Sequence, residues 1–166
     1  MADTVVGAGF VIDTRPLRAE ARKWGSLAEK WLMDELTTAF ERVGKIAQHE
    51  ANVLIKGGEG SNLAKASKVT TKVSGIDITT KVSWDAARSE SGFPYAAAVD
   101  TGRKAFGPVT AKVLRFEIGG EVIFAKWVKK FDGVHFTERG ENAAEPKAHD
   151  EVERAIDRFV ARMDAA

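Results

Sequence analysis

The chain has 166 residues, of which 44% are hydrophobic and 30% charged, and its formal net charge is +1. This balance is typical of one globular domain and excludes a wholly disordered chain. The even charge does not by itself predict a nucleic-acid-binding protein, and the lack of cysteine excludes disulfides and thiolate metal sites. No apolar run approaches the roughly 20 residues that span a bilayer, so we expect no membrane segment.

The N-terminal segment, residues 1–13, is mostly small and apolar, and Gly7 and Gly9 disfavour a helix there. We expect an N-terminal arm or a short strand, followed by a single α+β domain over residues 14–166. The first ten residues lack the basic region of a secretory leader, so we expect a soluble intracellular protein or one released by cell lysis.

A long amphipathic helix is predicted next. Apolar residues recur at steps of three and four from Leu17 to Leu54, and Gly57-Gly58 then ends the pattern. Unbroken, such a helix would measure roughly 60 Å, whereas a compact domain of this size is about 40 Å across. The helix therefore either kinks, with Gly25 and Gly44 as candidates, or extends onto a neighbouring subunit.

Two alternating runs, 68–73 and 76–84, predict a β-hairpin that turns at Ser74-Gly75. The pairs expected in this register are Val73 with Ile76, Thr71 with Ile78, Lys72 with Asp77, and Lys68 with Lys81. Four lysines gather around this hairpin: Lys65, Lys68, Lys72 and Lys81. They form either a solvated edge that discourages strand pairing or a surface for a polyanion such as DNA.

A short helix over residues 95–99, ending at Gly102, leads into a second hairpin that turns at Gly119-Gly120. The expected pairs are Leu114 with Ala125, Phe116 with Ile123, and Ile118 with Glu121. The other face of this hairpin is half apolar, which indicates contact with another subunit. Residues 131–147 are predicted to be a charged loop, and residues 150–163 a closing helix.

These elements predict an α+β fold in which a long N-terminal helix and a C-terminal helix pack on an antiparallel sheet of two hairpins. The three histidines, at 49, 135 and 149, match no metal-ligand spacing, and neither Gly-rich stretch has the context of a nucleotide-binding loop. We therefore expect no catalytic, cofactor-binding or metal site, and no enzyme. Trp24 and Trp31 are expected to anchor the core or a helix interface.

The stretch from Pro94 to Val128 carries a resemblance to a known family. It contains YAAAVDTG at 95–102, a Gly-Pro loop at 107–108, KVLRF at 112–116 and GEVIFAK at 120–126, after GSNLAKAS at 60–67. In this order the motifs resemble those of the neck and tail-completion proteins of long-tailed, non-contractile phages. That family tends to begin its last helix with Pro-Phe-Leu, where this chain has EPKAH at 145–149.

The resemblance implies a structural virion protein of the head–tail junction, present in the host cytoplasm during assembly. The expected assembly is a ring, hexameric in this family, which joins the head connector to the tail-tube or terminator proteins and lets genomic DNA pass without sequence preference. Two sets of residues would then face partners. The subunit contacts would be Tyr95, Arg103, Lys104, Phe106, Val122, Phe124 and Trp127, and the channel side would be Lys65, Lys68, Lys72 and Lys81.

Two other classes of function remain open at this point. One is a DNA-interacting accessory protein that uses the hairpin lysines, and the other is a small hydrolase whose site the sequence does not reveal. Within the resemblance itself, a tail terminator or minor tail protein is the alternative to a neck protein. The resemblance does not distinguish a position against the head connector from one against the tail tube.

Overall fold

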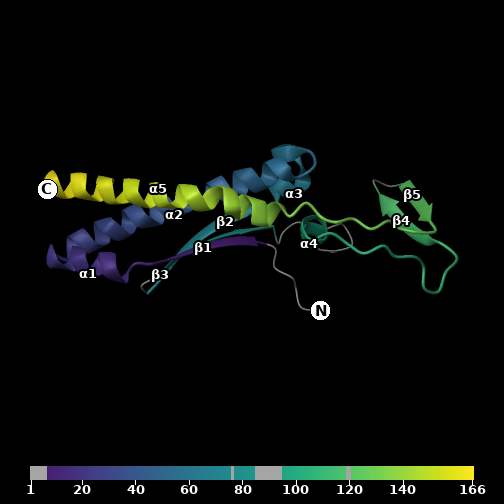
Figure 1. The fold of residues 1–166 in the computed structure, drawn as a ribbon, viewed down its shortest axis with the longest axis horizontal. Coiled ribbons are helices and arrows are strands. Elements are labelled where there is room, and N and C mark those ends of the chain that lie inside the picture. The colour runs from purple at the N-terminus through teal and green to yellow at the C-terminus, as the bar shows by residue number, and fades with distance from the viewer. Residues whose placement is uncertain (1–6, 76, 85–94, 119–120) are drawn as a thin grey trace.

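A computed structural model describes residues 7–75, 77–84, 95–118 and 121–166, which form an elongated molecule with a hairpin at one end (Figure 1). It confirms the predicted α+β class, because long N-terminal and C-terminal helices pack on a small antiparallel sheet. The elements are β1 (Gly7–Asp13), α1 (Arg15–Lys23), α2 (Ser26–Leu54), η1 (Gly58–Gly60), α3 (Asn62–Lys65), β2 (Lys68–Ser74), β3 (Asp77–Ser83), α4 (Tyr95–Asp100), β4 (Leu114–Ile118), β5 (Glu121–Ala125) and α5 (Phe136–Asp164).

The main sheet has three antiparallel strands in the order β1-β3-β2, so the N-terminal segment supplies an edge strand. Alternation along the central strand β3 buries Ile78, Thr80 and Val82 completely against the helices. The opposite face of the sheet carries no described helix. Among the described residues, the sheet therefore has one face covered by helices and one open face.

The predicted register of the first hairpin is wrong by two residues. Val73 pairs with Ile78 rather than Ile76, and Thr71 pairs with Thr80. A shift by two leaves every side chain on the same face, so the apolar pattern could not exclude it. The observed register lets the hydroxyls of Thr71 and Thr80 hydrogen-bond to each other at 2.7 Å, which satisfies a fully buried polar group.

The same shift removes two further pairs that the sequence predicted. Lys72 lies opposite Thr79 instead of Asp77, and Lys68 lies opposite Ser83 instead of Lys81. Gly75, with φ +59°, directly follows the last paired residue of β2, and residue 76 lies outside the described residues.

The predicted long helix bends at Gly25, one of the two expected positions. Gly25 separates α1 from α2 and has φ +106°, which favours glycine. Across the bend, Arg18 Nε donates to Glu29 Oε1 at 2.7 Å and Arg22 Nε donates to Glu29 Oε2 at 2.9 Å. These hydrogen bonds from Arg22 and Arg18 lower the pKa of Glu29 from 4.5 to about 2. The other candidate, Gly44, lies inside α2, where an added Cβ would sit 2.5 Å from Thr80 Cγ2.

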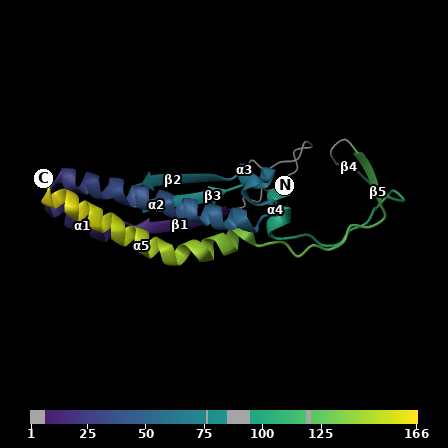
Figure 2. The ribbon, with the colours of Figure 1, turned by 90° about the horizontal axis from the view of Figure 1, so that it is seen from above.

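The C-terminal helix begins at Phe136, not at Asp150, so the loop predicted over 131–147 is mostly helix. α5 lies alongside α2 over the sheet (Figure 2). Small residues at four-residue spacing, Gly140 and Ala144, are buried in this contact. A Cβ on Gly140 would lie 2.7 Å from the carbonyl oxygen of Ala47, so glycine permits the close approach. Packing on α2 therefore outweighs the poor helix propensity of glycine and proline in this segment.

The aromatic residues of the body occupy distinct places in the core. Trp84 is fully buried, contacts Phe136 edge to face at 5.0 Å, and donates its indole N–H to Asn52 Oδ1 at 3.1 Å. Trp24, predicted as an anchor, is 58% exposed but stacks on Phe159 of α5 at 6.0 Å. Trp31 lies beneath the guanidinium of Arg162 at 4.4 Å. The two predicted tryptophan anchors thus both contact α5.

The second hairpin has the register that the sequence predicted, with Leu114 opposite Ala125 and Phe116 opposite Ile123. Its turn residues, Gly119 and Gly120, lie outside the described residues. The hairpin forms a two-stranded sheet of its own and does not extend the main sheet. Both views place it beyond the end of the helix–sheet body (Figures 1 and 2).

Candidate subunit interface

The hairpin and its two connecting segments form a projecting unit, residues 102–133, which we call the arm. Two pairs of backbone hydrogen bonds tie its segments together. At the root, Arg103 N–H donates to the Phe131 carbonyl at 2.7 Å, and Phe131 N–H returns a bond at 2.9 Å. Further out, Phe106 and Val128 exchange bonds of 3.0 and 2.8 Å. The arm is thus a ladder that extends away from the body.

Glycines make the root of the arm narrow. Gly102 and Gly133 have φ of +84° and +82°, and a Cβ on either would overlap the backbone of the opposite segment. Because α4 ends just before Gly102 and α5 begins just after Gly133, both segments leave the body at one point.

The arm exposes apolar side chains on both faces of its hairpin. Val122 and Phe124, on one face, are 44% and 63% exposed, and Ile123, on the other, is 43% exposed. Trp127 is 62% exposed, although its ring also packs on the backbone of Gly107. A two-stranded hairpin buries too little apolar surface to be stable by itself in water. The arm is therefore the described surface with the clearest need for a partner.

Six of the seven predicted contact residues lie on the arm: Arg103, Lys104, Phe106, Val122, Phe124 and Trp127. All six are exposed. Tyr95 does not belong with them, because it lies on α4 and packs partly buried against the core cluster of Trp84 and Phe136. The fold thus separates Tyr95 from the projecting surface.

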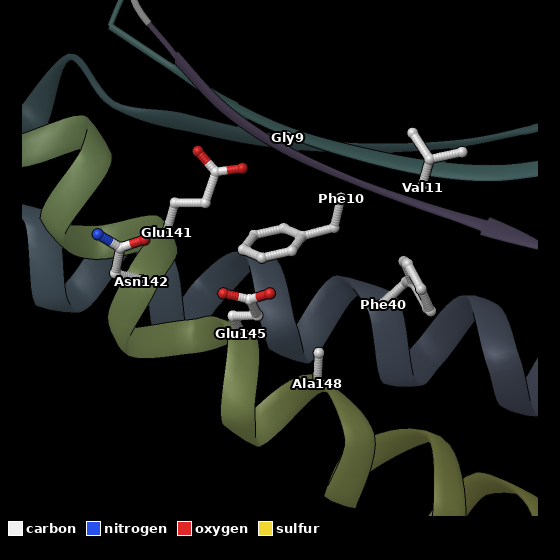
Figure 3. Close-up of a pocket in the computed structure, with 8 residues that line it drawn as sticks. All are labelled: Gly9, Phe10, Val11, Phe40, Glu141, Asn142, Glu145 and Ala148. Atoms are coloured by element: carbon white, nitrogen blue, oxygen red, sulfur yellow. The ribbon is translucent and has the colours of Figure 1, made fainter.

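A second surface, which the sequence did not predict, is an open groove of ≈330 Å³ between the edge strand β1 and helix α5 (Figure 3). Its lining comes from β1, α2 and α5, and α5 supplies the carboxylates. The lining residues are Gly9, Phe10, Val11, Phe40, Glu141, Asn142, Glu145 and Ala148. The prediction of a loop over 131–147 concealed this groove. The spacing of Phe136, Gly140 and Ala144 was the signal that could have revealed it.

The predicted channel-facing lysines are partly brought together. Lys68 and Lys72 of β2 and Lys81 of β3 lie on the open face of the main sheet, and all three are exposed. Lys81 is opposite Thr70, so it sits between the two lysines of the neighbouring strand. Lys65 lies on α3, outside the sheet. Three of the four lysines therefore form one basic surface, which we call the lysine face.

We compared the chain with family models, curated proteins and solved structures. None matches it. The resemblance to phage neck and tail-completion proteins therefore stays a prediction.

Two of the three histidines have partners on the surface. His49 Nδ1 lies 2.7 Å from Glu59 Oε1, and His149 Nε2 lies 3.2 Å from Glu153 Oε1, all on exposed side chains. His135, with φ +53°, precedes α5. Within the described ranges, no group of three or more His, Cys, Asp or Glu residues could hold a metal ion. Nor does any helix in the described part of the chain have the length and apolarity to cross a membrane.

Proposed function

We propose that this chain is a structural subunit of an oligomeric ring, and that the ring belongs to the head–tail junction of a phage. The observation that carries the oligomer is the exposed apolar surface of the arm, at Val122, Phe124 and Trp127. Exposed large apolar side chains gathered on one projecting unit mark sites of protein–protein contact. The motifs between Pro94 and Val128 support the phage setting, in which the ring would join the head connector to the tail tube.

A second candidate is a DNA-interacting accessory protein. The specific observation in its favour is the lysine face, where Lys68, Lys72 and Lys81 lie together on an uncovered side of the sheet. In a ring the same face would contribute to the lining of a channel for DNA. The two candidates differ in whether a single subunit binds DNA.

The oligomer is tested by the molar mass in solution. We expect light scattering to show species well above the 18.0 kDa of one chain, growing in population with concentration. Replacing Val122 and Phe124 by serine removes side chains that each contribute roughly 1.5–3 kcal/mol when fully buried. Assembly should therefore weaken about a hundredfold or more, while the melting temperature of the body stays unchanged.

The matched control is Val53→Ser, which removes an exposed apolar side chain from α2 and should leave the mass unchanged. A wild-type chain that stays monomeric at every concentration would contradict the oligomer. Unfolding of the Val122→Ser/Phe124→Ser variant would instead show that this face belongs to the core of the subunit.

A further inference from the structure

The β1–α5 groove has an apolar base and one acidic side, formed by α5. Phe10 and Ala148 lie at its base, and Glu141 and Glu145 stand one helical turn apart on α5 (Figure 3). Neither carboxylate forms an ion pair with any described residue. Over residues 136–153, α5 carries six acidic and two basic residues. The groove is thus an apolar site beside a helix segment that carries a net negative charge.

The edge of β1 adds a second reason for this groove to be covered. β1 pairs with β3 on one side and with no described strand on the other. Val11 on this strand is 66% exposed. Exposed edge strands with apolar side chains tend to associate with other chains unless something protects them.

The arm carries a net positive charge, opposite to that of α5 beside the groove. Its residues 102–133 include seven basic and three acidic residues. On the hairpin, Arg115 pairs directly across from Phe124, and Glu117 pairs across from Val122 on the same face. Lys126 directly follows the last residue of β5. The Phe124 end of this face therefore combines an exposed aromatic side chain with the nearby basic residues Arg115 and Lys126. The groove combines an apolar base with two carboxylates on its α5 side.

The arm cannot fill the groove of its own chain in this conformation. The hairpin lies beyond the end of the body in both views, and no arm residue lines the groove (Figures 1 and 2). A groove of one copy is therefore open to the arm of another.

A competing acceptor lies at the far end of the body, where Trp24, Val160, Met163 and Asp164 line a groove of ≈290 Å³. It adjoins α1, whose four basic residues are each ion-paired with a carboxylate. Charge alone therefore does not exclude the arm from that end. The β1–α5 groove differs in having two lining carboxylates instead of one, and in lying beside an edge of β1 that no described strand covers.

From this complementarity we propose that the β1–α5 groove receives the arm of a second copy of this chain, with Arg115 and Lys126 meeting Glu141 and Glu145 of the neighbour. The inference rests on the proposed function and names the acceptor surface of the ring. The contact joins two different surfaces, so successive copies are related head to tail. Such contacts close into rings when the rotation permits and otherwise grow into filaments.

The test is a charge-reversal cycle, read as the dissociation constant of assembly by light scattering or sedimentation. Arg115→Glu/Lys126→Glu on the arm and Glu141→Lys/Glu145→Lys on the groove should each weaken assembly at least about tenfold. A chain with all four substitutions should recover most of the loss, because the charges are again opposite. Lys56→Glu and Asp157→Lys, at positions outside both surfaces, are the controls and should change little.

A second readout does not depend on the stability of these variants. The chain has no cysteine, so Phe124→Cys and Glu141→Cys can be made on separate chains that carry different mass tags. Oxidation of the mixture should yield a disulfide between the two kinds of chain. Phe124→Cys mixed with Asp157→Cys should give much less, and strong cross-linking to Met163→Cys would place the arm at the far end instead.

The outcomes separate the two proposals. If the wild type assembles but the groove reversal leaves the mass unchanged, or the combined chain does not recover, the acceptor is another surface and the oligomer stands. If the wild type is monomeric throughout, the oligomer and the acceptor both fail.

Discussion

Gly140 sets how closely α5 approaches α2. Besides the carbonyl of Ala47, an added Cβ there would meet the Cβ of Ala51 at 2.8 Å. Both obstacles belong to the backbone or to its first side-chain atom, so neither can rotate away. The close packing that covers the sheet, and that forms one wall of the β1–α5 groove, depends on this glycine.

Gly140→Ala should therefore lower the free energy of unfolding by about 1–3 kcal/mol, although alanine is the better helix former. Chemical denaturation monitored by circular dichroism measures this change. Gly60→Ala is the control, because an added Cβ there meets nothing within 4 Å. A stabilised Gly140→Ala variant would mean that α5 can move away from α2 without cost.

The stability of the bend between α1 and α2 depends on pH through the carboxylate of Glu29. Its pKa is about 2 in the folded chain against 4.5 ordinarily, so the unfolded chain binds more protons between these values. Stability from the Arg18 and Arg22 contacts is thus complete above about pH 4.5 and is lost as the pH falls through 2. Compared with Glu29→Gln, the wild type should have a higher melting temperature at neutral pH.

That difference in melting temperature should shrink as the pH falls from 4.5 toward 2. Arg22→Gln, which removes one partner of the same carboxylate, should show the same trend. A difference that stays constant down to pH 2 would contradict the role of the ionised carboxylate.

At the scale of elements, α5 is where sequence and structure differ most. Gly140 and Pro146 interrupt helix propensity, and the charged residues between them are typical of a loop. Helix forms there because the small residues of α5 fit against Ala47 and Ala51 of α2, which lie far away in sequence. Pro146 has no backbone N–H, so the carbonyl of Asn142 lacks its usual hydrogen-bond donor in the helix. Asn142 also lines the groove.

The arm shows the opposite relation between sequence and structure. Alternating apolar residues and a Gly-Gly turn specified its register correctly, because both are local signals. Where the hairpin lies was not local information. Nothing in residues 114–125 distinguishes a hairpin that joins the main sheet from one that projects alone.

At the scale of the whole molecule, the arm, the groove and the lysine face lie on different parts of an elongated body. In a ring built by arm and groove, Lys68 and Lys72 of β2 lie away from both contacts, whereas Lys81 pairs with Gly9 at the edge of the groove. Lys68 and Lys72 would then be available to line a channel or to bind DNA, with Lys81 beside them.

Replacing these three lysines by glutamine should weaken binding to a DNA duplex and reduce its salt dependence. The slope of log affinity against log salt should fall by about 0.9 for each DNA phosphate that the variant no longer neutralises. Fluorescence anisotropy across a salt series measures this slope, and Lys30→Gln/Lys56→Gln, at exposed sites on and after α2, is the control.

The Val122→Ser/Phe124→Ser variant separates the two candidate functions. If it binds duplex as strongly as the wild type, the DNA-interacting accessory protein is favoured over the ring. Loss of binding together with loss of assembly supports a channel formed by several copies. If the slope of log DNA affinity against log salt is unchanged after the lysine replacements, the lysine face neither lines a DNA channel nor binds DNA.

The sequence by itself determined the class of the fold, the end of α2 and the register of the second hairpin, and it offered Gly25 as one of two positions for a bend. Each depends on periodicity, capping or turn residues within a few positions of one another. The tertiary structure decided the register of the first hairpin, the start of α5, the projection of the arm and the existence of the groove. These features depend on contacts between separate elements, such as the hydrogen bond between Thr71 and Thr80 and the close packing of Gly140 on Ala47. Such contacts leave no periodic pattern in the sequence of either element.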